Sequence, residues 1–271
     1  MARRRYTWDE RRIATWVRTG RGIGTGRDYV PWLKVSDVPS LGRVHRVFWA
    51  TTERDHHLLS DNEYYAFLGH CYDDDVIDIR EQFPLDRAET LEIARELGIR
   101  HPEDRTSKTP LVATTDFLVT RLADGGARNF AYAVKENCDL TKLRTIEKLE
   151  IERVYWTRRA VPWTIQVGSN IKTNVALNLA WIFDCRGARK AFEALGNEPT
   201  KEHLKATFDR HPAAPLRVAC KLVDTELKTK PGKTLQIARR LLSTKEMLVD
   251  LSVKGLVDLP CSEFSFPRGL A

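Results

Sequence analysis

The stretch ATTDFLVTRLADGGARNFAYAVK, residues 113–135, decides how this chain folds. Residues 113–122 and 129–135 are rich in β-branched and aromatic side chains, and an Asp-Gly-Gly turn signal separates them, which predicts two antiparallel strands joined by a hairpin. Asp116 lies within the first strand and Lys135 ends the second. Because a hairpin places residues of its two strands side by side, we expect these two charges to meet.

Alternating and helical periodicities extend this pattern on both sides of the hairpin. The strand expected before it is VIDIREQF, which stops at Pro84. The helix expected after it is charged and amphipathic, with Leu143, Ile146 and Leu149 inward, and a short apolar strand then lies parallel in the sheet. The expected helices cover 60–71, 90–97 and 142–158, and the flanking strands cover 76–83 and 162–167.

The composition shifts to helices and loops after Gly168, so two domains are predicted, residues 1–168 and residues 169–271. Two short strands over 247–251 and 256–259 follow the helices of the second domain. Helices followed by a short hairpin predict a winged-helix-like domain. Its expected helices cover 171–184, 200–210, 214–228 and 233–242.

The composition is that of a globular protein with a basic balance. The chain has 271 residues, 42% hydrophobic and 30% charged, and its 44 Lys and Arg against 37 Asp and Glu give a net charge of +7. This balance permits a polyanionic partner without requiring one. The longest stretch without a charged residue, 160–171, is too short to span a membrane. The five cysteines form no C-x-x-C pair and no apolar leader follows the N-terminus, so we expect a cytoplasmic protein with reduced thiols.

Basic and aromatic residues alternate near the N-terminus, which is typical of surfaces that face nucleic acid. Candidate phosphate or partner contacts are Arg3, Arg4 and Arg5, together with Arg239 and Arg240 on the late helix 233–242. The alternative for the N-terminal segment is a helix over 7–17 that packs Trp8, Ile13 and Trp16 on the core.

Two glycine-containing segments resemble phosphate loops only superficially. GRGIGTG, residues 20–26, is neither a G-x-G-x-x-G fingerprint nor a Walker loop, and Pro231-Gly232-Lys233-Thr234 lacks the upstream glycine of a P-loop. The sequence therefore contains no motif for nucleotide hydrolysis.

The order helix, three strands, helix, strand is the common core of the PD-(D/E)xK nucleases. In that arrangement Glu63 reaches Asp116 from the preceding helix. Two converging carboxylates favour a hard divalent cation, Mg²⁺ above all, and Lys135 would orient the attacking water or stabilise charge growing on a phosphate. The fold class expected is thus α/β, with a mixed α+β sheet and a restriction-endonuclease-like catalytic domain.

Each member of this triad has a structural alternative. Ser60 and Glu63 fit a capping box, so Glu63 could serve only the helix N-terminus. Asp116 among apolar neighbours must be paired, metal-bound or on the solvent face, because a lone buried carboxylate costs several kcal/mol. Lys135 could be an ordinary lysine at a strand end.

Longer strings in the same order resemble a known family, the TnsA-type endonuclease subunits of heteromeric cut-and-paste transposases. The resemblance covers most of the first domain and is thinner in the second. It is carried by GRGIGTGRDYVPWL (20–33), HHLLSDNE (56–63), DIREQFPL (78–85), TTDFLV (114–119), AVK (133–135) and EKLEIERVYW (147–156) followed by Pro162-Trp163, with GKTL (232–235) in the second domain.

The resemblance assigns roles to individual positions. It implies that Glu63 and Asp116 are metal ligands, that Lys135 is the catalytic lysine and that the backbone carbonyl of Val134 is a further ligand. Glu152 is similar to a family acid near the metal; its alternative is a solvated position on a charged helix.

The sequence departs from the family's motif at one position. The motif has Glu or Gln two residues before the lysine, and this chain has Ala133. The site therefore lacks one side-chain ligand, and water, the Val134 carbonyl or a helix glutamate must complete the metal shell.

The resemblance also implies a reaction and partners. A TnsA-like protein cleaves the 5′ ends of the transposon while a TnsB-type transposase cuts the 3′ ends, and a TnsC-type AAA+ ATPase contacts the complex. The implied cofactor is Mg²⁺, with Mn²⁺ as a substitute, and the implied partners are transposon-end DNA and these two proteins, with no membrane. Two alternatives stay open: a catalytically weakened assembly or DNA-binding subunit of that complex, and a stand-alone restriction or repair nuclease.

Overall fold

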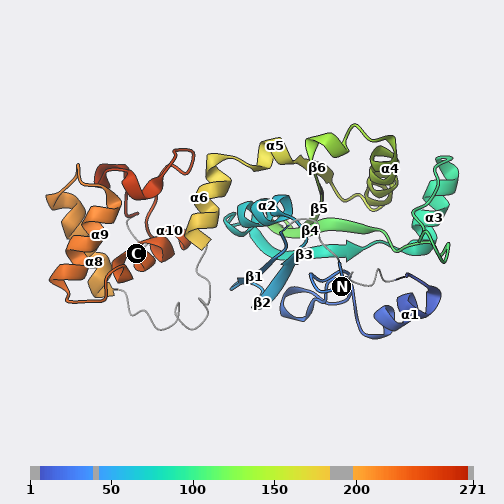
Figure 1. Cartoon of the computed structure of the whole chain (residues 1–271), viewed down its shortest axis with the longest axis horizontal. Helices are drawn as coiled ribbons and strands as arrows, with labels where there is room; N and C mark the ends of the chain where they lie inside the picture. Colours follow the sequence, from blue (N-terminus) through green and yellow to red (C-terminus); the bar gives the residue numbers. More distant parts are fainter. Residues whose placement is uncertain (1–6, 39–42, 184–197, 268–271) are drawn as a thin grey trace. The chain divides into compact units, whose positions relative to one another are not determined.

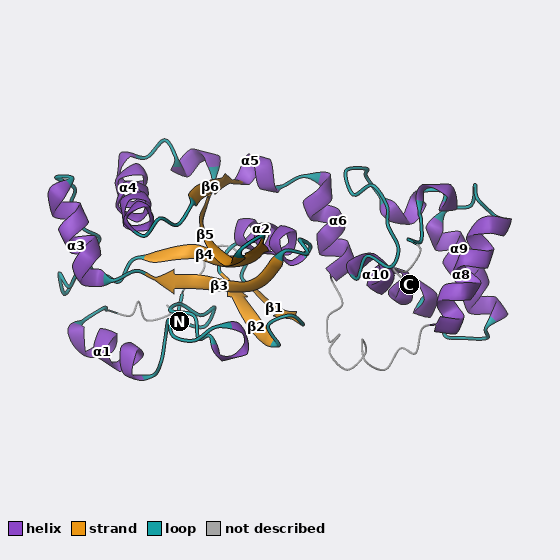
Figure 2. Cartoon of the chain, turned by 180° about the vertical axis from the view of Figure 1, so that it is seen from behind, coloured by secondary structure: helices purple, strands orange, loops and turns teal. Residues whose placement is uncertain are grey.

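A computed structural model describes residues 7–38, 43–183 and 198–267 (Figure 1). The chain divides into two compact units, residues 1–171 and 172–271. The sequence placed the domain boundary after residue 168, close to this division. The first unit holds the strands that carry the predicted site, and the second is built mainly from helices (Figure 2).

A four-stranded mixed sheet forms the centre of the first unit. Its strand order is β3-β4-β5-β6; the first three strands are antiparallel, and β6 runs parallel to β5. The predicted hairpin and the predicted parallel final strand are both confirmed. The strands are β3 (Val76–Pro84), β4 (Thr114–Ala123), β5 (Gly126–Lys135) and β6 (Trp163–Val167).

Helices cover both faces of this sheet. Leu118 of β4 packs in one cluster with Ile93 and Ile151 from two helices, whereas the neighbouring Phe117 lies 6.4 Å, ring to ring, from Phe67 of another. Successive residues of a strand face opposite sides, so the two clusters lie on opposite faces. The helices are α1 (Glu10–Arg18), α2 (Asp61–Cys71), α3 (Arg87–Glu96), α4 (Leu143–Arg158) and the short α5 (Gly168–Ile171); α2 carries Phe67, α3 Ile93 and α4 Ile151.

One detail of α4 was predicted wrongly. Leu143 and Ile146 are 74% and 44% exposed, although the periodicity placed them inward. The buried residues of α4 begin at Leu149, so its first turn precedes the part of the helix that packs on the core.

A second, two-stranded sheet was not predicted. It consists of β1 (His45–Trp49) and β2 (Arg54–Leu58), paired antiparallel. The buried positions of β2 alternate as expected for a strand, but two of them are Arg54 and His56. Polar side chains at the inward positions hid the hydrophobic alternation on which strand prediction depends.

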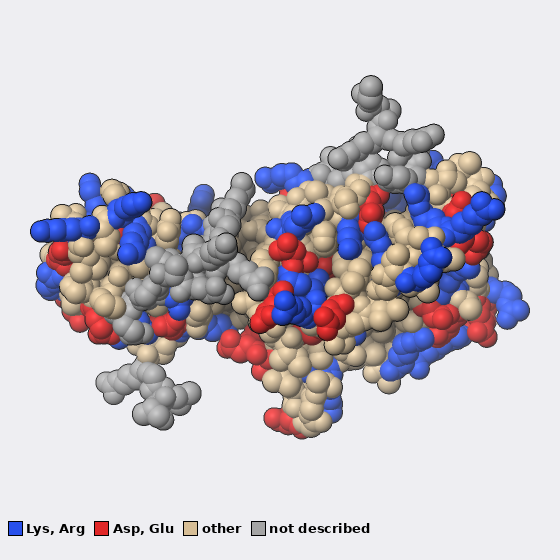
Figure 3. All heavy atoms as spheres, turned by 90° about the horizontal axis from the view of Figure 1, so that it is seen from below, with Lys and Arg blue, Asp and Glu red and all other residues tan. Residues whose placement is uncertain are grey.

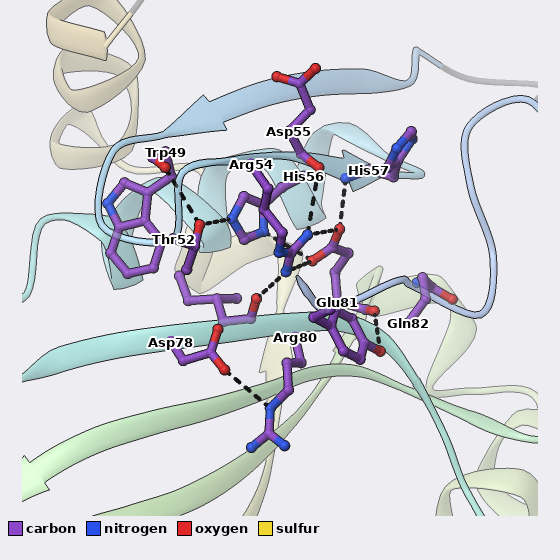
Figure 4. Close-up of polar contacts among 12 residues, drawn as sticks. Trp49, Thr52, Arg54, Asp55, His56, His57, Asp78, Arg80, Glu81 and Gln82 are labelled. Carbon is purple, nitrogen blue, oxygen red and sulfur yellow. Dashed lines mark hydrogen bonds and ion pairs between the residues drawn. The ribbon is translucent and has the colours of Figure 1, made fainter. Parts of the chain in front are cut away.

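These polar residues belong to a buried network centred on Glu81 of β3 (Figure 4). Arg54 donates from Nη1 to Glu81 Oε1 at 2.8 Å and from Nη2 to Oε2 at 2.7 Å. His56 Nδ1 lies 2.9 Å from Oε2, and the His57 amide donates to Oε1 at 3.0 Å. The Glu81 and His56 side chains are fully buried, so the network fixes the second sheet to β3 through the interior.

The network determines how its members ionise. Burial opposes the charge on Glu81, but hydrogen bonds and charge from His56 and Arg54 outweigh it and hold the pKa of Glu81 far below its ordinary value. Burial also lowers the pKa of His56, against the attraction of Glu81. Arg54 is therefore the cation that compensates the Glu81 carboxylate.

The glycine-rich segment has an architectural role next to this network. Gly22 has φ +78°, and a Cβ there would lie 2.1 Å from Pro84 Cγ; Gly24 has φ +96°, and a Cβ there would lie 2.5 Å from the Asp28 carbonyl oxygen. Both positions thus exclude side chains. The segment continues into η1 (Gly26–Asp28), whose first carbonyl accepts a hydrogen bond from Arg54 Nε at 3.0 Å.

The alternative reading of the N-terminal segment, a helix packed on the core, is confirmed for its described part. Asp9 caps α1, and Ile13 is buried. Trp8 and Trp16 contact each other with ring centroids 4.6 Å apart, and Trp16 lies 5.4 Å from Trp32. Arg3, Arg4 and Arg5 lie outside the described residues.

The second unit keeps the predicted helices but not the predicted hairpin. Leu248 exchanges both backbone hydrogen bonds with Ser265, so the strands expected over 247–251 and 256–259 do not pair with each other. Residues of the latter form the short helix η3 instead. The hairpin predicted there is therefore wrong, and the winged-helix-like character of the unit stays a prediction. The elements of the unit are α6 (Asn174–Phe183), α8 (Glu198–Arg210), α9 (Leu216–Glu226), α10 (Lys233–Ser243), η3 (Leu256–Asp258) and η4 (Cys261–Glu263).

Charge and hydropathy agree with the composition. Basic and acidic side chains are interspersed on the face drawn in Figure 3, without one continuous basic patch on that face. Among the described residues, no helix is both long and apolar enough to cross a membrane. Cys71, Cys138, Cys220 and Cys261 are free thiols.

Replacing Arg54 by Met tests the network. The variant leaves the buried Glu81 carboxylate without its cation, so we expect the free energy of unfolding, measured by urea denaturation at pH 7, to fall by about 3–5 kcal/mol. Arg27→Met is the matched control, because Arg27 pairs with Glu53 on the surface, with side chains 70% and 55% exposed. The control should change stability by less than about 1 kcal/mol. Equal effects of the two substitutions would contradict the assigned role of Arg54.

Candidate active site

The site lies at the point where β4 and β5 of the main sheet separate, which is called the fork below. The β4–β5 ladder ends at the pair Phe117–Tyr132, but β5 continues beside β6 as far as Lys135. In the gap, Asp116 Oδ2 accepts a hydrogen bond from the Val134 amide at 2.7 Å. The carboxylate thus replaces a backbone partner at the fork, which explains why an acid is tolerated in an apolar strand.

Lys135 meets Asp116 at this fork, as the hairpin predicted. Its Nζ donates to Asp116 Oδ2 at 2.7 Å and to the Val134 carbonyl at 2.9 Å. Burial acts to lower the pKa of Lys135, but the charges of Asp116, Glu152 and Glu63 outweigh it and raise the pKa above its ordinary value. The lysine is therefore a fixed cation beside the carboxylates.

Glu63 reaches the fork from the first turn of α2. Its amide donates to the cap Ser60 Oγ at 3.1 Å, and Ser60 Oγ donates to its Oε1 at 3.1 Å. Its Oε2 accepts from the Leu59 amide at 2.9 Å. The capping box is thus real, and it orients the Glu63 carboxylate rather than competing with a second role.

Gln82 of β3 joins the two carboxylates. Its Nε2 lies 3.4 Å from Glu63 Oε2 and 3.5 Å from Asp116 Oδ1. The structure therefore brings together Glu63, Asp116 and Lys135, which come from a helix and two strands. Burial, and then the charge of Asp116, raise the pKa of Glu63 to about 7.

Glu152 of α4 is buried behind the fork and is not on a solvated helix face. Its Oε1 accepts from Thr115 Oγ1 at 2.8 Å and from Trp163 Nε1 at 3.0 Å. Burial, followed by the charge of Asp116, raises the pKa of Glu152 to about 7. These contacts hold the acid in place near Asp116, and its role as a metal ligand stays a prediction.

The donor set fits a hard divalent cation. Within residues 7–38, 43–183 and 198–267, no three His, Cys, Asp or Glu side chains gather tightly enough to hold a metal by themselves. The site instead offers carboxylate oxygens from Glu63 and Asp116 and the Val134 carbonyl, the oxygen ligands that Mg²⁺ prefers. Ala133 is fully buried and has no polar side-chain atom, so water and a phosphate oxygen would supply the remaining positions.

The predicted basic contacts of the second unit are not tested by this geometry. Arg239 and Arg240 both lie on α10 and are half-buried. The Arg239 guanidinium carbon lies 5.3 Å from the centre of the Trp181 ring. Their contact with DNA or a partner stays a prediction.

Residue-by-residue reasoning missed three polar residues of the site: Gln82, Thr115 and Trp163. Thr115 Oγ1 also accepts from Trp156 Nε1 at 2.6 Å, so it connects β4 to α4 on the side of Glu152. The available signal for Gln82 was its position inside the string DIREQFPL, which carried the resemblance but assigned it no role.

The comparisons with known proteins define the class first. Residues 73–167 match the family described as TnsA-like endonuclease N terminal, and residues 170–251 match TnsA endonuclease C terminal. The first unit is therefore a restriction-endonuclease-like domain, as its mixed sheet and forked strands indicate.

A relative then gives the family. The chain is 40% identical over 242 residues to the transposon Tn7 transposition protein TnsA of Escherichia coli, and the match covers 89% of this chain and 86% of that protein. The chain belongs to the TnsA family of endonucleases, which confirms the resemblance seen in the sequence. The match to the C-terminal family also extends it across a domain where the sequence strings were few.

Glu152→Gln separates the acid's charge from its hydrogen bonds, since Gln keeps an oxygen for Thr115 and Trp163. Without metal, an acid whose pKa is about 7 in the fold and near 4.3 when unfolded makes the protein lose stability as pH rises through that window. In EDTA, urea denaturation between pH 5 and 7 should show the variant gaining stability relative to wild type as pH rises.

The control for this experiment is Glu150→Gln on the same helix. Glu150 is paired with Arg153, and its pKa is lowered by that hydrogen bond. Its substitution should not produce the gain. The same pH dependence in wild type and Glu152→Gln would show that Glu152 is not held protonated in the metal-free fold.

Proposed function

We propose that this protein is a Mg²⁺-dependent DNA endonuclease that cleaves the 5′ ends of a transposon within a heteromeric cut-and-paste transposition complex. The observation that carries the proposal is the fork itself. This is a chain of the TnsA endonuclease family, and its Glu63 and Asp116 carboxylates both lie within 3.5 Å of the Gln82 side-chain nitrogen. Lys135 Nζ lies 2.7 Å from Asp116 Oδ2.

The chain's residues divide the work of phosphodiester hydrolysis. Glu63, Asp116 and the Val134 carbonyl would hold Mg²⁺, or Mn²⁺ in its place. The ion supplies charge to polarise the scissile phosphate and to lower the pKa of a water. Lys135 keeps its proton because acidic groups surround it, so its ammonium is available to orient that water or to stabilise the charge that develops on the phosphate.

The partners follow from family membership rather than from the fork. The relative is named a transposition protein, and we infer that this chain acts with transposon-end DNA, a TnsB-type transposase that cuts the 3′ ends and a TnsC-type AAA+ ATPase. The net charge of +7 is compatible with a polyanionic partner. Arg3, Arg4, Arg5, Arg239 and Arg240 are the proposed phosphate or partner contacts. Such a complex assembles on DNA, so a cytoplasmic location is part of the proposal.

A second candidate function has one observation in its favour. Ala133 stands, fully buried, where the family motif has a polar side chain, so the site has one side-chain ligand fewer. A catalytically weakened chain would act as an assembly subunit of the same complex. Excision would then proceed without 5′ cleavage by this chain.

Asp116→Ala tests the proposed reaction. Removing the carboxylate at the fork takes away a metal ligand and the partner of Lys135, so 5′-strand cleavage in the presence of the TnsB-type and TnsC-type partners should fall by about 100-fold or more. Strand-specific nicking on end-labelled transposon DNA measures it. Asp124→Ala, in the exposed turn of the same hairpin, is the control and should cleave like wild type.

Three results would redirect the proposal. Persistent 5′ cleavage by Asp116→Ala would refute the metal site. Cleavage by the isolated wild-type chain would favour a stand-alone nuclease. Excision with no 5′ cleavage by wild type would favour the assembly subunit.

A further inference from the structure

Gln82 occupies a position in β3 that directs its side chain to the fork. The β3–β4 register pairs Glu81 with Phe117 and Phe83 with Thr115, which puts Gln82 level with Asp116. Its side chain is buried, with 3% exposure. The amide nitrogen lies between the carboxylates of Glu63 and Asp116, as described above.

The orientation of the Gln82 amide follows from its neighbours. Thr114 Oγ1 donates to Gln82 Oε1 at 3.2 Å, and the two groups on the other side are carboxylates. A hydroxyl can donate or accept, but an ionised carboxylate only accepts. The nitrogen must therefore face Glu63 and Asp116, and the oxygen must face Thr114.

The backbone of Gln82 is also unusual. Its φ is +48°, a left-handed conformation that side chains with a Cβ rarely adopt. The neighbouring Glu81 is fixed on its side chain by Arg54 and on its carbonyl by Tyr29 OH at 3.0 Å, and the Gln82 carbonyl accepts from the Trp32 amide at 3.3 Å. Figure 4 shows Glu81 and Gln82 next to each other in this network. The surrounding contacts thus hold a conformation that the residue alone would avoid, as is common at functional sites.

Ala133 makes this arrangement more significant. Ala133 lies two residues before Lys135 on the same face of β5, and there it presents only a buried methyl group. Gln82 is the polar side chain that spans the two carboxylates, and it comes from the strand on the other side of Asp116.

We propose that Gln82 is a positioning residue of the nuclease site, whose side-chain amide holds Glu63 and Asp116 at a common point for one divalent cation. The proposal rests on the proposed function. Two like-charged carboxylates repel each other before the cation binds, and the amide N–H group between them opposes that repulsion. Its loss should weaken metal binding more than it slows the reaction at saturating metal.

Two substitutions remove the side-chain amide, and they differ in how readily they adopt the left-handed backbone conformation. Gln82→Leu keeps side-chain bulk, and Gln82→Gly removes the side chain but fits the left-handed conformation. Mn²⁺ alone is titrated into the full-length proteins, with binding followed by the electron paramagnetic resonance signal of free Mn²⁺. We expect both variants to bind about 10-fold more weakly than wild type, the scale seen when partners of metal ligands are removed. The Mg²⁺ concentration for half-maximal 5′ cleavage should rise by a similar factor.

Three further proteins complete the experiment. Ala160→Gly changes another left-handed residue, φ +52°, outside the site and should bind Mn²⁺ like wild type. Thr114→Val removes the hydrogen bond to the Gln82 amide oxygen and should also weaken Mn²⁺ binding. If both Gln82 variants fail to fold, this variant tests the positioning role. Asp116→Ala should lose binding altogether.

The outcomes separate the two proposals. If Asp116→Ala loses Mn²⁺ binding but Gln82→Leu and Gln82→Gly bind like wild type, the positioning role is overturned and the nuclease site stands. If the Gln82 variants lose only urea resistance, the role of Gln82 is structural. If wild type and Asp116→Ala bind Mn²⁺ equally, or neither binds, the metal site of the proposed function is overturned and the positioning role with it.

Discussion

The compensation of the buried Glu81 carboxylate is the constraint on which the first unit depends. A charge with no exposed surface requires a cation and several hydrogen bonds. Arg54 supplies the cation from β2 and also donates to the Gly26 carbonyl, so one guanidinium joins the second sheet, the glycine-rich segment and β3. The same requirement fixes the strand immediately before Gln82, which connects the interior network to the proposed metal site.

The fork between β4 and β5 also holds an acid that must be compensated, but its partners differ from those of Glu81. Asp116 is compensated by the Val134 amide and the Lys135 ammonium rather than by a buried arginine. Its Oδ1 is left to the long contact with Gln82, and burial, followed by the charge of Asp116, raises the pKa of the neighbouring Glu63. Glu81 is satisfied by the protein, whereas the acids at the fork exceed the local positive charge. We propose that a divalent cation is the complement of this excess.

The sequence predicted the main sheet and the triad because both depend on local patterns. Hydrophobic alternation located β3, β4 and β5, and the Asp-Gly-Gly turn predicted the antiparallel pairing of β4 with β5, which brought Asp116 to Lys135. The β1–β2 hairpin escaped prediction because its inward residues are polar. Their burial is compensated by pairing with Glu81, which lies far along the chain. Such a pairing has no signature in either segment taken alone.

The predicted hairpin of the second unit and the inward residues at the start of α4 were wrong for a similar reason. The strands over 247–251 and 256–259 have strand-like composition, but Leu248 pairs with Ser265, and only the tertiary structure shows which backbone groups find each other. Leu143 and Ile146 fit the helical period but precede the part of α4 that meets the sheet.

Ala133 bears directly on whether the site is active. A resemblance transfers roles position by position, so a missing side chain in the motif counts as a missing ligand. The space between the two acids nevertheless holds a polar group, because the Gln82 side chain reaches it from β3. An amide nitrogen cannot ligate a cation as a carboxylate does, but it can keep two carboxylates where a cation needs them. With Gln82 in the proposed positioning role, Ala133 leaves the site with one side-chain ligand fewer but still ordered, and for this reason we favour the endonuclease over the assembly subunit.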